Sequence, residues 1–201
     1  MRDMPIQEWA RPVVLEGSLV RLEPLRRDHL EDLAAVAFDA PIWRWTIMGD
    51  QDRPGLERWL ETAVTNLESG LECPFATIDL ATGRAIGSTR FLSIVPEHRR
   101  LEIGWTWIGT VYQRTGRNRE AKLLQLTHAF ETLGANRVEF KTHARNEPSR
   151  NALAGIGATF EGVFRRHMIM PDGSLRDSAY FSIIATEWPA VKAALERSVA
   201  R

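Results

Sequence analysis

Residues 111–133 read VYQRTGRNREAKLLQLTHAFETL, a short basic turn that runs into a stretch with helical periodicity. The run before it, LEIGWTWI at residues 101–108, alternates as a β-strand does. A tight turn between a strand and a helix gathers the first, unpaired N–H groups of that helix and the positive end of its dipole at one place. We therefore expect this stretch to decide the fold, and its turn to bind an anion.

The flanking segments predict an α+β domain whose sheet is mixed but mostly antiparallel. We expect strands within residues 14–25 and over 73–80, 85–95, 101–108, 136–142, 159–168 and 178–184. We expect helices over about 28–37, 56–67, 118–133, 146–154 and 188–199, with an irregular segment over 40–54. The path from strand 101–108 through the helix to strand 136–142 is a crossover, which places two parallel strands side by side.

Bulk properties indicate an ordinary globular protein. The 201 residues include 26 Lys plus Arg and 26 Asp plus Glu, and this charge balance argues against a dedicated nucleic-acid binder. The single cysteine, Cys73, excludes an intrachain disulfide and fits a reducing compartment. Because no apolar run has the length of a signal peptide or a membrane span, we expect no membrane association and a cytoplasmic location. We expect one domain over residues 1–201, with an N-terminal arm over 1–14.

The element order and two turns resemble the GNAT superfamily of N-acetyltransferases. The turn Gln113-Arg114-Thr115-Gly116-Arg117-Asn118 follows the family pattern Gln/Arg-x-x-Gly-x-Gly/Ala, except that Asn118 replaces the last small residue. The segment from this turn to NEPSRNAL at residues 146–153 is similar to the subgroup that contains the ribosomal-protein N-terminal acetyltransferases (RimJ/RimL-like). An asparagine at this position can still cap a helix and tolerates a left-handed backbone.

The resemblance implies a GNAT-like acyl-CoA N-acyltransferase fold, in which helices flank the sheet and the parallel pair splays apart. It also implies acetyl-CoA as co-substrate, with the diphosphate on backbone N–H groups of the basic turn. The cofactor-binding residues are then Trp107, Ile108, Gln113, Arg114, Thr115, Gly116, Arg117, Asn118, Arg119 and Asn146. The turn carries four cations, Arg114, Arg117, Arg119 and Lys122, and Glu120 is the one negative charge among them. Either a solvated basic surface or a phosphate site explains this cluster, and Lys122 or Arg119 is a candidate for the 3′-phosphate.

Acetyl transfer needs a base that takes a proton from the amine and a group that protonates or stabilises the leaving thiolate. Glu102, on the strand that leads to the thioester, is the candidate base. His98 is the alternative, since an ordinary histidine pKa of about 6.5 suits the task, and either residue can instead be a paired or solvated surface group. The resemblance gives Asn146 a contact with pantetheine and Ser149 the role of acid, whereas helix chemistry makes Asn146 an N-cap.

The acceptor implied by the resemblance is a primary amine, either a protein N-terminus or a small molecule. Its pocket is expected between the first helices and the final hairpin, with Trp43, Trp45, Phe91, Trp105 and His167 as candidate substrate-binding residues. The tryptophans can instead form core. We expect no metal, because neither the histidines nor the cysteine have ligand spacing. A homodimer is suggested by the resemblance alone.

Two functions remain open from the sequence. The first is an N-acetyltransferase in which the amine attacks acetyl-CoA directly in a ternary complex. The second is a non-catalytic CoA-binding sensor or protein-interaction module.

Overall fold

A twisted sheet organises the part of the chain that the structure describes, which is residues 6–49 and 51–200 of a computed structural model. Within that part, eight strands lie in the order β1-β2-β3-β4-β5-β6-β8-β7. The strands are β1 (Leu15–Glu16), β2 (Val20–Pro24), β3 (Cys73–Asp79), β4 (Arg84–Val95), β5 (Arg100–Ile108), β6 (Arg137–His143), β7 (Thr159–Ile169) and β8 (Leu175–Ile184). All neighbours are antiparallel except β5 and β6, so the predicted α+β class and the parallel crossover are confirmed.

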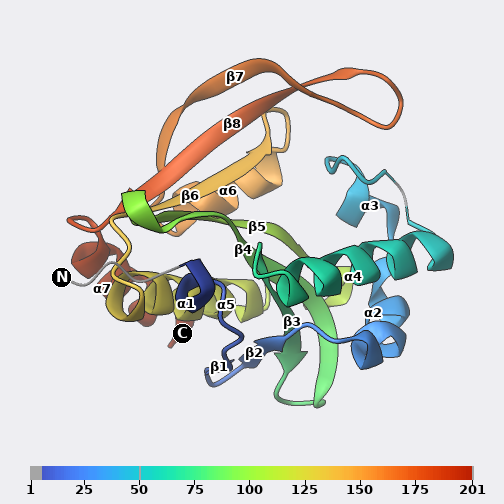
Figure 1. Ribbon diagram of the computed structural model, residues 1–201, viewed down its shortest axis with the longest axis horizontal. Helices are drawn as coiled ribbons and strands as arrows, with labels where there is room; N and C mark the ends of the chain where they lie inside the picture. The colour runs from blue at the N-terminus through green and yellow to red at the C-terminus, as the bar shows by residue number, and fades with distance from the viewer. Residues whose placement is uncertain (1–5, 50, 201) are drawn as a thin grey trace.

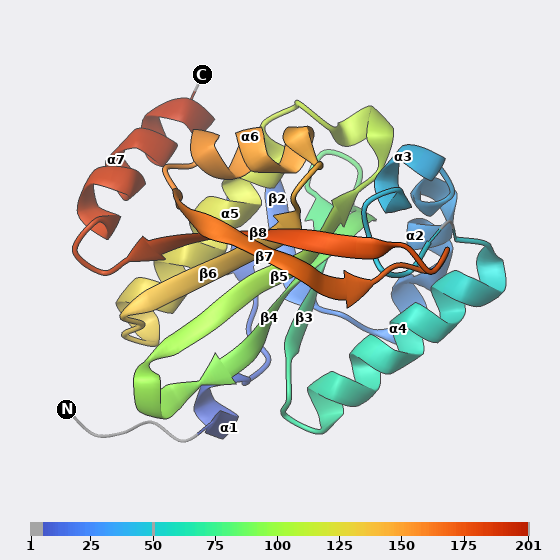
Figure 2. The same cartoon turned by 90° about the horizontal axis from the view of Figure 1, so that it is seen from above.

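Helices cover both faces of this sheet (Figure 1). They are α1 (Ile6–Trp9), α2 (Leu30–Ala37), α3 (Ala40–Trp43), α4 (Arg53–Glu68), α5 (Arg117–Thr127), α6 (Glu147–Gly155) and α7 (Trp188–Val199). Shorter helical turns are η1 (Arg27–His29), η2 (Pro96–His98), η3 (Thr110–Tyr112) and η4 (His128–Thr132), the last a π-helical extension of α5. One apolar core joins the sheet to α5, α6 and α7, and a second joins it to α2, α3 and α4. In Figure 2 the strands fan out between α6 and α7 on one side and α2 and α4 on the other.

Two expectations about the first third of the chain gain detail from the structure. In the arm expected over residues 1–14, Trp9 is only 2% exposed and packs with Ala10 into the larger core. Residues 1–5 of that arm lie outside the described residues. The segment expected to be irregular begins with the short helix α3, whose first turn contains Pro41. Proline favours that position because a helix leaves the first N–H groups unpaired in any case.

The parallel pair β5–β6 is joined only at one end. Its register pairs Arg100 with Arg137, Leu101 with Val138, and Glu102 with Glu139. Beyond that point β5 continues alongside β4 to Ile108, and β6 continues alongside β8 to His143. The two strands therefore separate after Glu102 and leave an opening in the sheet, which is the predicted splay.

A bulge bends β5 beside this opening. Ser88 of β4 pairs with Trp107, whereas Arg90 pairs with Gly104, so the register shifts between the two pairs. Within the bulge, Trp105 has a φ of 50°. A left-handed backbone at a residue other than glycine costs of order 1–3 kcal/mol, and bulges of this kind redirect side chains near functional sites.

Candidate active site

The N-terminus of α5 lies at one end of the site. Gly116 is its N-cap residue, with a φ of 85°, and no side chain caps the helix among the described residues. The N–H groups at the start of the helix are therefore available to an anion, because the first intrahelical bond runs from Glu120 N to Gly116 O. Only glycine suits this backbone well, and a Cβ here would lie 3.2 Å from Leu19 Cδ1. Asn118, considered above as a cap, lies inside the first turn instead.

The cations of the basic turn divide between solvent and the protein: Arg114 and Arg119 are exposed, whereas Arg117 is half-buried and Lys122 is buried. Arg117 Nε lies 2.8 Å from Asp79 Oδ1, and its guanidinium stacks 5.5 Å from the ring centre of Tyr112. Arg119 Nη1 donates to Ser198 Oγ in α7 at 2.5 Å. Arg114 is exposed, with a φ of 61°. Most of the positive charge at this turn is thus already engaged by the chain.

Lys122 points into the molecule beneath the β5 bulge. Its Nζ donates to Thr106 Oγ1 at 2.7 Å, to Thr89 Oγ1 at 3.1 Å and to Gln125 Oε1 at 3.2 Å. Burial lowers the pKa of Lys122 to about 7. The expectation that Lys122 is a candidate for the coenzyme's 3′-phosphate was therefore wrong.

Glu120 fixes α5 to the first two strands rather than opposing the cations. Its carboxylate accepts hydrogen bonds from Ser18 N at 2.8 Å, Ser18 Oγ at 2.6 Å, and Leu19 N and Val20 N at 2.7 Å each. Burial acts to raise the pKa of Glu120, but these four hydrogen bonds outweigh it and hold the pKa below its ordinary value. The clamp settles where the helix N-terminus lies relative to the sheet.

Two further predicted residues bound the opening. The side chain of Gln113 donates to the Ile108 carbonyl at 3.3 Å and closes the end of β5. Asn146 Oδ1 accepts from Ser149 N at 3.2 Å, so Asn146 is the N-cap of α6, as helix chemistry alone would have it. Both Asn146 and Ser149 follow the end of β6, on the open side of the splay. Their predicted contacts with a coenzyme remain predictions.

Glu102 stands where the opening begins. The residue is 5% exposed, and its Oε2 lies 3.5 Å from Lys141 Nζ. Burial raises the pKa of Glu102 above its ordinary value, although the Lys141 ammonium acts in the opposite direction. The carboxylate has room because residue 104 is glycine: a Cβ there would lie 2.9 Å from Glu102 Oε1. His98, the alternative base, is exposed in η2, before the closed end of the β5–β6 pair, and so lies away from the opening.

Beyond Glu102, β6 and β8 present a polar face that the sequence analysis did not identify. We call it the acceptor face; its members are Glu102, Glu139, Lys141, His143, Arg176, Ser178, Tyr180 and Ser182. Strand alternation puts these residues on one side, because Val138 and Phe140 of β6 and Phe181 of β8 are buried in the core on the other. The alternation can be read from the sequence, but the pairing of β6 with β8 next to Glu102 cannot.

His143 has a defined tautomer on this face. Its Nδ1 accepts a hydrogen bond from Arg145 N at 3.0 Å, and its ring packs 4.8 Å from that of Trp45. Burial, with a smaller effect from the Arg176 charge, lowers the pKa of His143. The neutral ring therefore carries its proton on Nε2, assigned from this hydrogen bond, and presents a donor rather than a base there.

The predicted substrate-binding residues divide into core and surface. Trp43 is 1% exposed, packs 5.2 Å from Trp107 and donates from Nε1 to Ala37 O. Phe91 is also 1% exposed and meets Phe75 edge-on in the α5-side core. The prediction that these two residues line the acceptor pocket was wrong, because their rings are already enclosed by the protein. The other three predicted residues remain candidates for the acceptor pocket: half-buried Trp45 and Trp105, and exposed His167.

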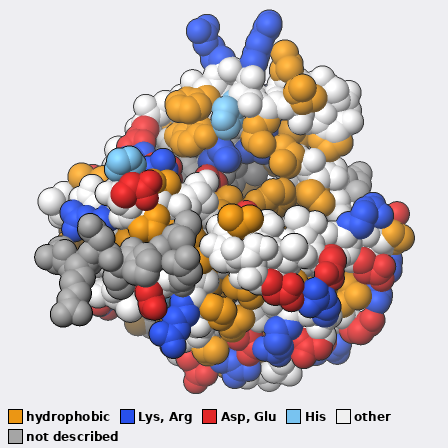
Figure 3. Space-filling view, viewed as in Figure 1, with side chains coloured by type: hydrophobic (Ala, Val, Ile, Leu, Met, Phe, Trp, Pro, Cys, Tyr) orange, Lys and Arg blue, Asp and Glu red, His pale blue; other side chains and the backbone are white. Residues whose placement is uncertain are grey.

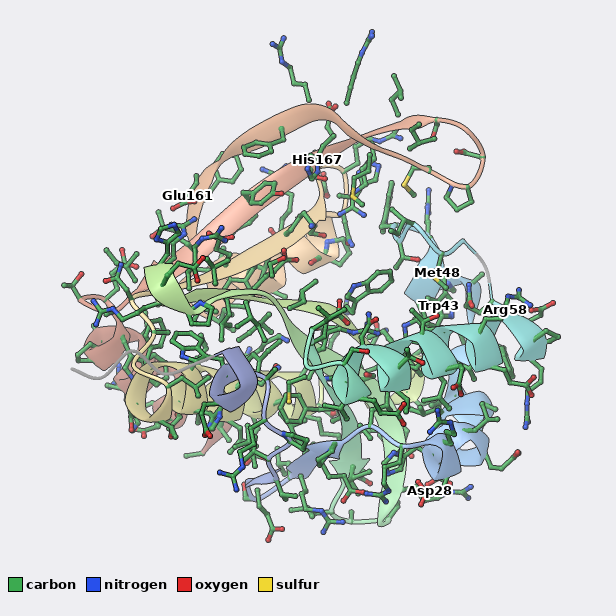
Figure 4. The ribbon with its side chains drawn as sticks, viewed as in Figure 1. Asp28, Trp43, Met48, Arg58, Glu161 and His167 are labelled. Carbon is green, nitrogen blue, oxygen red and sulfur yellow. The ribbon has the colours of Figure 1, made fainter. Side chains whose placement is uncertain are left out.

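The surface is hollowed below the final hairpin. Figure 3 shows a hollow below the β7–β8 hairpin, with basic and histidine side chains gathered at its upper rim. On the hairpin itself, an open concavity of about 780 Å³ is lined by Phe164, Arg165, Arg166 and His167, where β7 bulges away from β8, and no residue of the acceptor face lines it. In Figure 4 His167 lies on the hairpin, across the gap from Met48 and Trp43. Its Nδ1 lies 3.1 Å from Ser178 Oγ, which ties the bulge to the acceptor face.

Residues 6–49 and 51–200 contain no group of three or more His, Cys, Asp or Glu side chains placed to hold a metal ion. None of the helices in those ranges is both long and apolar enough to cross a membrane.

Comparison with known proteins gives consistent matches. Residues 20–159 match the family described as an acetyltransferase (GNAT) domain. A putative ribosomal N-acetyltransferase, YdaF of Bacillus subtilis (strain 168), is 29% identical over 76% of this chain and 75% of its own. The chain covers only 57% of the length of another of the curated relatives that it matches.

Solved structures extend the comparison to 94% of this chain. A GCN5-related N-acetyltransferase from Brucella melitensis matches with a TM-score of 0.87 and 34% identity, over 94% of this chain and 86% of that one. RimJ of Mycobacterium smegmatis, solved in complex with CoA-disulfide, has the same fold. It matches with a TM-score of 0.80 and 22% identity, over 94% of this chain and 96% of that one.

Proposed function

Because the chain belongs to the acetyltransferase (GNAT) family, we propose that it transfers an acetyl group from acetyl-CoA to a primary amine. In this proposal the amine attacks the thioester directly while both substrates are bound. One observation carries it. The opening between β5 and β6 lies between an uncapped helix N-terminus, at Gly116, and a buried carboxylate, Glu102.

The coenzyme fits the first of these two features. The N–H groups at the start of α5 suit its diphosphate, and the unpaired length of β5 and β6 suits the amide-bearing pantetheine arm. The CoA complex of the M. smegmatis RimJ, which shares the fold, supports this choice. Bound there, the coenzyme supplies an acetyl group as a thioester. Arg114, exposed on the turn, remains available to its phosphates.

Glu102 is the base in this proposal. An amine reacts only when neutral, so a proton has to leave its nitrogen before or during attack. A buried carboxylate with a raised pKa is a stronger base than an ordinary one and takes that proton, directly or through a water. An α-amino group, with an ordinary pKa of about 8, asks less of this base than a lysine side chain at about 10.4. Ser149 remains the candidate acid for the thiolate.

The test is thiol release from acetyl-CoA across a panel of primary amines that includes peptides with free N-termini. We expect turnover with at least one amine in the wild type, and its loss in Glu102→Gln with acetyl-CoA affinity retained. Tight acetyl-CoA binding without turnover on any amine contradicts the proposal, and favours the non-catalytic CoA-binding module instead.

A further inference from the structure

A buried arginine without a carboxylate partner lies on the acceptor face. Arg176 of β8 is 7% exposed. Its Nε donates to Ser178 Oγ at 3.2 Å and its Nη1 to the Trp45 carbonyl at 3.3 Å, and both acceptors are neutral. Among the described residues, no carboxylate oxygen lies within 4.0 Å of a guanidinium nitrogen of Arg176.

The nearby carboxylates are already engaged by other cations. Glu102 pairs with Lys141 at 3.5 Å. Glu139 lies 2.8 Å from Arg137 Nε and 3.5 Å from Arg100 Nη1. Arg176 therefore has no carboxylate in direct contact: burial lowers its pKa, the more distant Glu102 charge acts in the opposite direction, and the Arg176 charge itself acts to lower the pKa of both His143 and His167.

Arg90, the other buried arginine facing this side of the sheet, has partners of two kinds that Arg176 lacks. Its Nη1 donates to Glu72 Oε2 at 2.7 Å, and its guanidinium lies 5.6 Å and 5.1 Å from the ring centres of Trp59 and Trp105. Arg90 thus has its own carboxylate and two aromatic faces. Arg176 has neither a carboxylate nor an aromatic face that the structure pairs with it among the described residues.

A guanidinium does not shed its charge when it is buried. Leaving that charge without a counter-ion is costly, whereas a planar carboxylate can accept two parallel hydrogen bonds from it. Nη2 of Arg176 has no hydrogen-bond partner among the described residues, and it is not one of the unpartnered nitrogens that the fold seals from solvent. Its two N–H groups are therefore unused donors for an anion.

We propose that Arg176 binds a carboxylate carried by the acceptor, so that the acceptor is an amine and a carboxylate in one molecule. This inference rests on the proposed function, with the amine end at Glu102 and the carboxylate end at Arg176. The same chemistry occurs in a free amino acid and in a peptide with an acidic residue next to its N-terminus. The backbone of Trp45, which accepts from Arg176, closes this subsite from the α3 side.

The test compares acceptors with and without this carboxylate, with each kcat/KM expressed per neutral amine, because a carboxamide also lowers the pKa of the neighbouring amino group. One arm uses amino acids against their carboxamides, and a second uses pentapeptide amides with Glu or Gln at position 2. We expect the wild type to prefer the carboxylate form in one arm by about 10- to 100-fold in kcat/KM, as befits a charge-assisted hydrogen-bond pair. The arm that shows the preference identifies the source of the carboxylate.

Variants assign the preference to Arg176. Arg176→Gln should abolish it with an unchanged KM for acetyl-CoA, and Arg176→Lys should restore part of it. Arg58→Gln, an exposed arginine on α4 labelled in Figure 4, is the charge-matched control and should leave it intact. Melting temperatures of all variants identify any that misfold.

Calorimetric titration of the same carboxylate and amide compounds gives an answer that does not depend on turnover. We expect the carboxylate to bind the wild type at least about 10-fold more tightly than its amide, and equally to Arg176→Gln. Equal binding of both forms by the wild type overturns the inference about Arg176. Preferential binding without acetylation keeps this inference and overturns the proposed function instead.

Discussion

The basic turn before α5 and the acceptor face hold their positive charge in different ways. At the turn, Arg117 has a counter-charge in Asp79, whereas Arg119 and Lys122 donate to neutral oxygens of the chain. On the acceptor face Arg176 also donates to neutral oxygens, but it is buried, and its Nη2 has no hydrogen-bond partner among the described residues. Local charge in a sequence therefore indicates less about a ligand than the donors that the fold leaves unused.

What the turn offers to an anion is mostly backbone. Gly116 holds the left-handed conformation that starts α5, and Glu120 fixes the helix to the first strands. The contrast is thus between a coenzyme end built from N–H groups and an acceptor end built from charged side chains. Four substitutions test the contrast.

The largest effect is expected for Glu102→Gln. Removal of a general base typically lowers the rate by about 10²- to 10⁴-fold, here in kcat/KM, while the Kd for acetyl-CoA stays unchanged. The wild-type rate should fall in acid through a pKa above the ordinary 4.5, since the ionised form is needed and burial raises the pKa. A pH profile of kcat/KM measures both effects, and the acid limb should be missing from the variant.

Measurements of unfolding separate a catalytic role of Glu102 from a structural one. A raised carboxyl pKa means that the folded state prefers the protonated form, so stability is lost as pH rises through that pKa. Glu102→Gln should therefore unfold at no lower denaturant concentration than the wild type at pH 8. His143→Gln is the control for the base and should keep the acid limb, because His143 Nδ1 already accepts from Arg145 N. Loss of the limb in His143→Gln assigns the base to the histidine instead.

Glu120→Gln should be the most destabilising change at the coenzyme end. The amide cannot accept all four hydrogen bonds, and the backbone donors left unpaired cost about 3 kcal/mol of unfolding free energy at pH 7. Because the pKa of Glu120 is lowered, the difference from wild type should persist above its ordinary value and shrink as pH falls through the lowered one. Urea unfolding at several pH values measures it. Glu57→Gln, at an exposed position of α4, should change little, and an equal loss there argues against the clamp.

Gly116→Val should weaken acetyl-CoA binding by about 10-fold or more. A β-branched residue resists a φ of 85°, and its side chain would crowd both Leu19 and the anion at the helix start. Gly83→Val is the matched control, since Gly83 has a φ of 70° in the β3–β4 turn and an added Cβ meets nothing within 4 Å. Calorimetry should show weaker binding for Gly116→Val only. Unchanged affinity there means that the coenzyme lies elsewhere.

The smallest effect is expected for Lys122→Met. Because burial lowers the pKa of Lys122 to about 7, the unfolded chain binds more protons above that pH, and wild-type stability should rise with pH. The rise attributable to this group is about 1 kcal/mol from pH 7 to pH 8, and it should vanish in Lys122→Met. Parallel urea titrations at the two pH values measure it. An identical pH slope in both proteins shows that Lys122 is charged and solvated.

The sequence predicted what depends on local patterning. It predicted the strands, the five longer helices, the parallel crossover and Glu102 on β5, because alternation and helical spacing are properties of single segments. It misplaced Trp43 and Phe91, since an aromatic residue fits a core as well as a pocket wall. It missed Arg176 and His143, because the neighbours of a strand come from tertiary pairing.

Two-substrate steady-state kinetics test the central claim most directly, with acetyl-CoA and the best acceptor of the panel both varied. We expect intersecting lines for the wild type, as a ternary complex requires. Gly116→Val should raise KM for acetyl-CoA alone, and Arg176→Gln should raise KM for the acceptor alone. Parallel lines, or either variant raising KM for the other substrate instead, contradict a coenzyme end at α5 and an acceptor end at β8.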